Sequence, residues 1–155
     1  MDLEPSTVVS ESTAHELAQS CSRAMHAKDY VAQELGMSLV ESSPGHATMT
    51  MTVRRDMLNG HAVCHGGIIF ALADTVFAHA CNSYNDVSLA TSCTIDFLAP
   101  APEGDQLTAT ARERARRKRT GVYDVEVCNE DGEVIAIFRG KSHATGKPMI
   151  PESHQ

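Results

Sequence analysis

The stretch NGHAVCHGGIIFALADTVFAHACN, residues 59–82, joins a histidine-rich loop and two glycines to a long apolar segment. Apolar side chains cover almost every face of the helix that this segment predicts, and a helix that is apolar all round is typically buried. One carboxylate, Asp74, interrupts it. Because an unpaired buried carboxylate is costly, we expect Asp74 to have a partner or a chemical task.

The two glycines, Gly66 and Gly67, stand where this helix is expected to begin. The first N–H groups of a helix have no partner within the helix, so such an end attracts anions and developing negative charge. The loop is therefore predicted to activate an electrophile, and Asp74 is predicted to act as a base or a nucleophile.

Hydrophobic and turn patterns predict the elements around this helix. A capping-box pattern, Thr13-x-x-Glu16, predicts the start of a first helix after a disordered tail of residues 1–12. Two strands flank the turn at Pro44-Gly45. Four strands follow the central helix, at residues 88–98, 106–113, 121–128 and 133–142. This order predicts a single α+β domain at residues 13–147, with one antiparallel sheet around one buried helix, and a loose C-terminal end that includes residues 148–155.

At these residues the chain resembles a known family, the phenylacetate-pathway thioesterases of the hotdog-fold superfamily. The resemblance rests on the stretch from Asn59 to Asn82 together with three later segments in the same order. They are TSCTIDFLAP at 91–100, TGVYDVEV at 120–127 and FRGKSH at 138–143. The resemblance covers roughly residues 25–147. It implies a sheet wrapped around the central helix and hydrolysis of aryl-CoA thioesters, of the phenylacetyl-CoA or hydroxyphenylacetyl-CoA type, to free acid and coenzyme A.

Asp74 follows Gly66 by eight residues, which separates the two by about 12 Å along one helix. That is too far for both to act on one carbonyl carbon in the same subunit. Either they do not share a site, or a second subunit brings its own helix start beside Asp74. The resemblance implies the second option, because hotdog proteins pair as dimers with antiparallel central helices. A tetramer built as a dimer of dimers is also expected from it.

Four residues are candidates for the chemistry. Asp74 would attack the thioester carbonyl or activate water as a general base, unless it only binds a neighbouring loop. The Gly66 N–H would stabilise the oxyanion, while Gly67 helps to form the turn and contacts substrate. His65 would contact the carbonyl or fix the loop. Asn59 would hold the water or orient Asp74, unless Asn59-Gly60 is simply a turn.

The phosphates of coenzyme A need positive charge or backbone N–H groups. Lys118, Arg119, Thr120 and Gly121 precede a strand that the resemblance places near the ligand, and Arg139 and Lys141 are further candidates. The alternative is that the basic run at residues 112–119 is only the solvated end of a strand pair and its turn.

Composition narrows the remaining possibilities. The net charge of −7 gives no electrostatic case for nucleic-acid binding by the chain as a whole. Five cysteines do not suggest a disulfide framework, and with no signal peptide and no membrane span we expect a cytoplasmic protein. The spacing of histidine, cysteine and acidic residues matches no zinc pattern, so no metal or cofactor is expected. Two other functions stay open: a hydroxyacyl-thioester hydratase or dehydratase, and a non-catalytic acyl-CoA-binding module.

Overall fold

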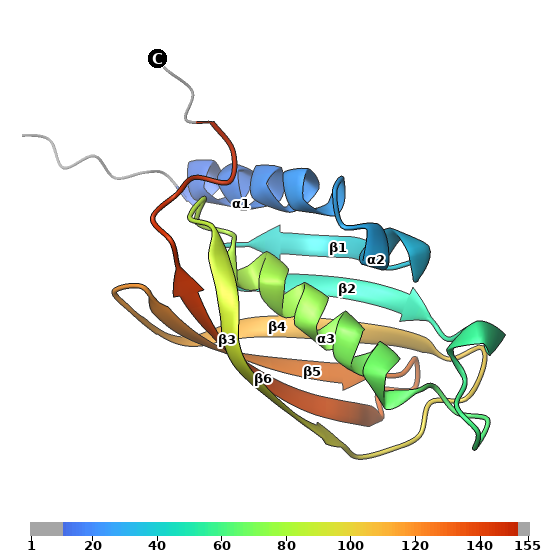
Figure 1. Cartoon of the computed structure of the whole chain (residues 1–155). Helices are drawn as coiled ribbons and strands as arrows, with labels where there is room; N and C mark the ends of the chain where they lie inside the picture. Colours follow the sequence, from blue (N-terminus) through green and yellow to red (C-terminus); the bar gives the residue numbers. More distant parts are fainter. Residues whose placement is uncertain (1–10, 152–155) are drawn as a thin grey trace, which may run out of the picture.

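The computed structural model of the protein describes residues 11–151 (Figure 1). Its elements follow the predicted order of helix, two strands, long helix and four strands, with two short helical turns added. They are α1 (Glu11–His26), α2 (Tyr30–Glu34), β1 (Ser38–Ser43), β2 (His46–Thr52), η1 (Arg55–Met57), α3 (Gly66–Cys81), β3 (Ser88–Phe97), β4 (Gln106–Arg117), β5 (Thr120–Cys128) and β6 (Val134–Ala144).

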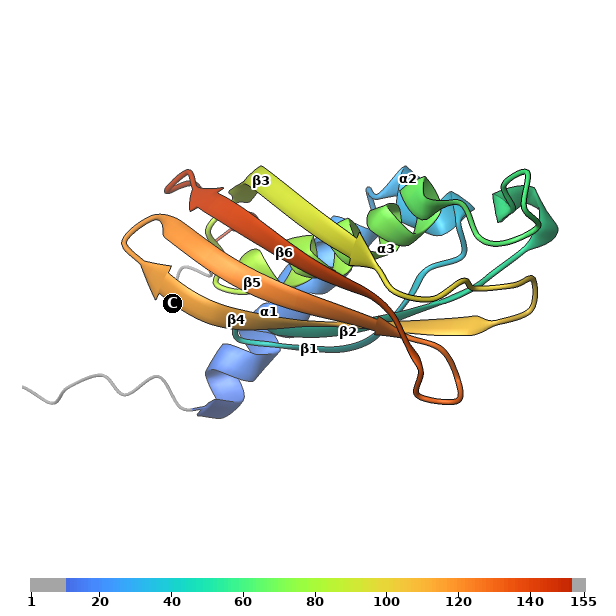
Figure 2. The ribbon, with the colours of Figure 1, turned by 90° about the horizontal axis from the view of Figure 1, so that it is seen from below.

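The strands form one antiparallel sheet in the order β1-β2-β4-β5-β6-β3. The sheet curves around α3, as Figures 1 and 2 show, which is the arrangement expected from the resemblance to hotdog proteins. The two edges of the sheet differ. α1 runs along β1 and is tied to it where the Ser22 and Ser42 hydroxyls meet at 2.7 Å. β3 pairs on one side only, with β6.

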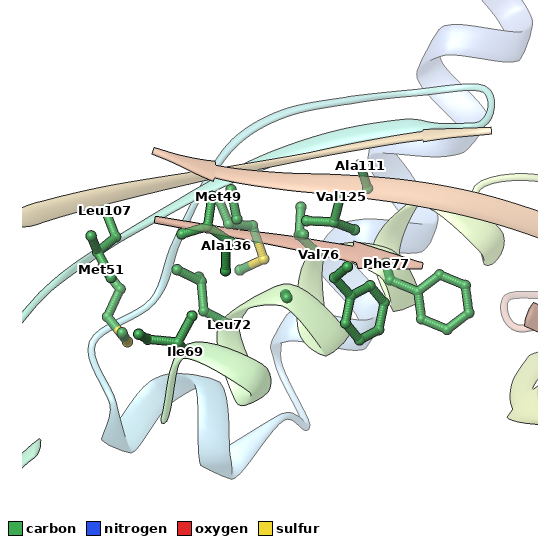
Figure 3. Close-up of a cluster of buried hydrophobic side chains, with 14 of the residues drawn as sticks. Met49, Met51, Ile69, Leu72, Val76, Phe77, Leu107, Ala111, Val125 and Ala136 are labelled. Atoms are coloured by element: carbon green, nitrogen blue, oxygen red, sulfur yellow. The ribbon is translucent and has the colours of Figure 1, made fainter. Parts of the chain in front are cut away.

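One face of α3 and the inner face of the sheet make the core (Figure 3). Side chains alternate along β2, because Met49 and Met51 are buried, as is Val53 directly after the strand. The sheet approaches α3 so closely at Gly140 that a Cβ there would lie 2.8 Å from the Phe77 ring. Burial of this apolar surface is the main stabilising contribution of the fold.

The opposite face of α3 is not fully buried by the described residues, 11–151. Gly67 is exposed, and Ala71, Asp74 and Ala78 are only partly covered. The expectation that this helix is buried on every side is therefore wrong for the single chain. The reason is that the sheet wraps around one side of the helix and stops at β3, which leaves a strip of small residues and one carboxylate uncovered.

The predicted ends of the domain also need correction. α1 begins at Glu11, two residues before the expected start, and residues 1–10 lie outside the described part of the chain. The described part of the C-terminal end, up to residue 151, is not loose, because the Asn85 side chain binds it. The Asn85 Oδ1 accepts from the N–H groups of Met149 and Ile150, at 3.0 and 2.9 Å. Within residues 11–151, no helix is long and apolar enough to cross a membrane.

Candidate active site

The loop before α3 is held by the Asn59 side chain. Its Oδ1 accepts from the N–H groups of His61 and Val63, at 2.9 and 3.4 Å, and the Asn59 N–H donates to the Val63 carbonyl at 2.8 Å. This is the local turn that Asn-Gly sequences favour. With Oδ1 used in this way, the amide hydrogens of Asn59 have no acceptor within residues 11–151 and are free to donate elsewhere.

His65 caps the start of α3. Its Nδ1 accepts from the Gly67 N–H at 2.9 Å, so a neutral His65 carries its proton on Nε2. Gly67 is therefore already bound, whereas the Gly66 N–H has no acceptor among residues 11–151. Of the two glycines, Gly66 is the one whose N–H remains available to an incoming oxygen.

A groove of about 420 Å³ lies at this end of the helix. It brings together residues from the loop, from α3 and from the segment after β3, namely Asn59, Val63, Cys64, Gly66, Ile69, Phe97, Leu98, Ala99 and Pro100. Two predicted site residues, Asn59 and Gly66, thus lie in one groove. The Phe97 ring stands directly against Gly66, since a Cβ on Gly66 would be 3.1 Å from the ring's Cζ. Any side chain at Gly66 would force this ring to shift.

Asp74 does not line that groove. It lies about two turns further along α3, on the uncovered face, and within residues 11–151 its carboxylate has no hydrogen-bond or ion-pair partner. Burial, and secondly the Asp29 carboxylate at the start of α2, raise the pKa of Asp74. Burial and then the Asp74 carboxylate raise the pKa of the Cys93 thiol in β3. Asp74 thus lies within electrostatic range of the start of α2 and of β3.

The predicted phosphate ligands fall into two groups. Lys118, Arg119 and Thr120 are exposed at the turn between β4 and β5. Gly121 is buried on the inner face instead, where a Cβ would come within 2.6 Å of the Tyr123 ring, so packing alone explains this glycine. The basic run at residues 112–119 forms the end of β4 and the exposed turn that follows it. Lys118 and Arg119 in this turn have no ion-pair partner among the described residues.

Arg139 and Lys141 lie on the outer face of β6. The Arg139 guanidinium binds the Asp124 carboxylate with two hydrogen bonds, at 2.6 and 2.9 Å, and holds the pKa of Asp124 below its usual range. Arg114 contacts the same carboxylate at 3.3 Å. Arg139 is therefore largely neutralised, whereas Lys141 is exposed.

Other chemistries find less support in this arrangement. Burial raises the pKa of the Cys64 thiol to about 11 and that of Cys81 to about 12, so both are poor nucleophiles near neutral pH. Among the described residues, no three histidine, cysteine or acidic side chains are placed to hold a metal ion.

Comparison with known proteins assigns the chain to a family. The thioesterase superfamily profile matches residues 61–136. The acyl-coenzyme A thioesterase PaaI of Escherichia coli is 50% identical over 130 residues, which are 84% of this chain and 93% of PaaI. The chain belongs to the PaaI family of the thioesterase superfamily. The structure of E. coli PaaI, a protein of the phenylacetic acid degradation operon, matches with a TM-score of 0.86 over 87% of this chain and 98% of PaaI, at 48% identity.

A second solved structure agrees. A mutant form of the phenylacetic acid degradation protein PaaI of Thermus thermophilus, 36% identical, matches with a TM-score of 0.72 over 74% of this chain and 98% of its own. Membership of the PaaI family confirms the hotdog fold and makes the protein a thioester hydrolase. It disfavours the hydratase and the non-catalytic alternatives.

Sequence reasoning did not assign roles to Phe97, Cys93 or Asp29. All three lie beside predicted site residues only because β3 and α2 return to α3 in the fold. Phe97 belongs to the TIDFLAP segment that carries the family resemblance, yet no periodicity indicates that the end of this strand meets the start of α3.

Proposed function

We propose that the protein hydrolyses aryl-CoA thioesters, of the phenylacetyl-CoA or hydroxyphenylacetyl-CoA type, to the free acid and coenzyme A. It would act in the cytoplasm during phenylacetate catabolism, without a metal or a bound cofactor. The substrate class is taken from the relatives named for acyl-coenzyme A thioesterase activity and phenylacetic acid degradation. The observation that carries the proposal is a pair of groups on α3 with no partner in the described chain, the Asp74 carboxylate and the Gly66 N–H.

Both groups would meet in a dimer that pairs β3 with a second copy of itself. An unpaired edge is a template for another strand, and proteins usually protect such edges with lysine, proline or a covering element. β3 carries none of these within its ten residues. Its Leu89 is an exposed apolar side chain, at 62%. These properties support β3 as the dimer contact, with the uncovered face of α3 closed by the partner.

The contacts between β3 and α3 suggest a specific register. The Asp74 carboxylate acts electrostatically on the Cys93 thiol, and the Phe97 ring lies against Gly66. Four residues of strand span about 13 Å, close to the about 12 Å between Asp74 and Gly66. If two copies of β3 pair antiparallel about Ile95, Cys93 of one chain lies opposite Phe97 of the other. The second chain's Gly66 then comes level with the first chain's Asp74.

Within such a site the thioester oxygen would accept from the Gly66 N–H, which stabilises the negative charge that develops there. In one route Asp74 takes a proton from water as the water oxygen attacks the carbonyl carbon. The tetrahedral intermediate then expels the coenzyme A sulfur, which receives the proton. In the other route the Asp74 carboxylate attacks the carbonyl carbon and the C–S bond breaks, so that an anhydride forms and coenzyme A leaves as a thiolate. Water then hydrolyses the anhydride to the acid and the Asp74 carboxylate, and the proton released neutralises the thiolate. His65 would hold the helix start, and the free amide of Asn59 would orient water or substrate.

The phosphates of coenzyme A would bind Lys118 and Arg119, with Thr120 and Lys141 as neighbours. Lys118, Arg119 and Lys141 are exposed and have no ion-pair partner among residues 11–151, while Arg139 is bound to Asp124. A tetramer, formed as a dimer of dimers, remains our expectation from the family resemblance.

Mixing two inactive variants tests the shared site. Asp74→Asn removes the base, and Gly66→Pro removes the N–H. Proline is tolerated at the first helical position, and His65 already has the extended ψ of 133° that a residue before proline requires. After subunit exchange, half of the dimers should carry one working site, so about one quarter of wild-type activity should return.

Gly66→Ala is the matched control, because it keeps the N–H and should retain more activity than Gly66→Pro. Verified exchange between the two inactive variants without any returning activity would rule out a site shared in this way. Full activity in Gly66→Pro would rule out the oxyanion role of Gly66.

A further inference from the structure

Phe97 occupies an unusual position for an exposed aromatic residue. It is the last residue of β3, its side chain is 52% exposed, and its ring rests against Gly66. No other aromatic ring among residues 11–151 contacts it. The ring thus rests against the helix start, while about half of the residue's surface remains exposed.

The groove around this ring is apolar where the ring borders it. Ile69, Leu98 and Pro100 line it beside Phe97, and Asn59 brings the amide side chain. Such a combination, with apolar walls and few polar groups, is typical of sites that bind an apolar ligand in a fixed orientation. The polar groups lie at the loop and at the Gly66 N–H, so the polar end of a ligand belongs there.

We propose that Phe97 determines specificity by stacking against the aryl ring of the acyl group. This inference rests on the proposed function. A thioester oxygen bound to the Gly66 N–H fixes the carbonyl beside the Phe97 ring. In a phenylacetyl group one methylene carbon joins the carbonyl to the aryl ring, so the two rings fall within contact range. Offset-stacked and edge-to-face ring pairs are favourable at such separations, beyond their apolar burial.

The experiment compares phenylacetyl-CoA with cyclohexylacetyl-CoA, which has a ring of similar size but no aromatic face. Wild-type kcat/KM should be higher for phenylacetyl-CoA. In Phe97→Leu, which keeps an apolar side chain but loses the ring, the ratio of the two kcat/KM values should fall by about threefold to tenfold. Val40→Ala, at the opposite edge of the sheet, truncates another exposed apolar side chain and should leave the ratio unchanged.

Two results would overturn the proposed role of Phe97. An unchanged ratio in folded Phe97→Leu overturns the inference. Equal kcat/KM values for the two substrates in the wild-type enzyme overturn it without any variant, which covers the case in which Phe97→Leu does not fold. Phe97→Met provides a second variant with an unbranched apolar side chain.

Failure of the proposed function would look different. If the wild-type enzyme released no thiol from any acyl-CoA, the proposed activity itself would be wrong. If it preferred long aliphatic acyl groups to both ring substrates, the proposed aryl class would be wrong. Retained preference for phenylacetyl-CoA in Phe97→Leu would contradict only the role of Phe97.

Discussion

At the scale of single residues, the catalytic role that we propose for Asp74 comes with a cost to the stability of the fold. Its pKa is raised by burial first and by Asp29 second, so the folded chain favours the neutral acid. A carboxyl group whose pKa is higher in the folded than in the unfolded state lowers stability as pH rises through that interval. We therefore expect Asp74→Asn to have an equal or higher Tm at pH 7, while kcat falls by at least about 100-fold. Calorimetry and a thiol-release assay check the two parts.

The same shift predicts the acid limb of the pH profile. Whether base or nucleophile, Asp74 must be ionised, so kcat/KM should fall as pH drops through its raised pKa. Asp29→Asn removes the neighbouring charge and should move this limb to lower pH, while asparagine still caps α2 at Ala32. An acid limb that stays in place in Asp29→Asn would argue against Asp74 as the titrating group.

His79 predicts a second pH effect, on stability. It is 1% exposed, its Nδ1 meets the Ser22 hydroxyl at 3.0 Å, and its Nε2 is buried without a partner in the described chain. Burial, and secondly the charge of His26, lower the pKa of His79 to about 4, although the Asp29 carboxylate acts to raise it. The folded state thus favours neutral His79.

The contribution of neutral His79 to the stability of the fold is fully present above pH 6.5, the ordinary pKa of histidine. It is lost as pH falls towards 4, because the unfolded chain takes up the proton more readily than the folded one. The full loss approaches about 3 kcal/mol, or several degrees in Tm. His79→Asn keeps a group that can bind Ser22 but does not titrate. Its Tm should therefore fall less between pH 7 and pH 4.5 than the wild-type Tm does, and parallel curves would refute the assignment.

At the scale of elements, the proposed pairing of β3 with a second copy of itself can be tested by a disulfide cross-link between the two strands. Residues directly opposite each other in antiparallel strands have Cα atoms about 4.5–5.5 Å apart, which a disulfide can bridge. With the register centred on Ile95, Phe97→Cys places a new thiol opposite Cys93 of the second chain. Mild oxidation should then produce a covalent dimer on a non-reducing gel.

Two controls define this result. The dimer band should disappear in the double variant Cys93→Ser/Phe97→Cys. Leu89→Cys, at the other end of β3, would face Ala101 in this register and should give no band. A band from Leu89→Cys that exceeds the one from Phe97→Cys would mean that the strands pair in another register.

The turn between β4 and β5 carries the prediction for coenzyme A. Arg116 is engaged, because its guanidinium stacks on the Tyr84 ring at 3.6 Å, and Glu113 accepts from the hydroxyls of Tyr84 and Tyr123 at 2.8 and 3.0 Å. This cluster fixes the base of the hairpin and leaves Lys118 and Arg119 free at its tip.

Replacing Lys118 and Arg119 by glutamine should therefore raise KM for a full coenzyme A thioester and change kcat little, because distant phosphate contacts add uniform binding. A pantetheine thioester, which lacks the nucleotide phosphates, should be affected much less. The double variant Lys28→Gln/Arg55→Gln makes the same charge change elsewhere on the surface. Equal effects on both thioesters would mean that the tip is only a solvated face.

At the scale of the whole molecule, the order of elements followed from the sequence because each signal is local. The alternation of Met49, Met51 and Val53 and the apolar run of α3 depend on neighbours within a few residues. The separation of Gly66 from Asp74 was also predictable, since it needs only the rise of one helix.

Long-range contacts were not predictable in this way. The hold of Asn85 on Met149 and Ile150 spans more than sixty residues of sequence. Glu113 accepts a hydrogen bond from Tyr84, which lies 29 positions away in the sequence. The Phe97 ring at the end of β3 lies against Gly66 at the start of α3. The sequence also held a local signal at His79, which follows Asp74 and Thr75 as a polar side chain in the apolar helix and whose position there indicates burial.

The continuous helix α3, which carries both Gly66 and Asp74, also limits where residues can be inserted into or deleted from the chain. One residue inserted between Gly66 and Asp74 would turn Asp74 by about 100° around the helix and shift it by about 1.5 Å, away from β3 and the face it shares with Gly67. The turn at Asp131 and Gly132, by contrast, lies at the surface and far from both groups along the chain. Insertions and deletions among descendants of this gene should therefore accumulate in such turns, while the spacing of the glycine pair and the aspartate stays constant.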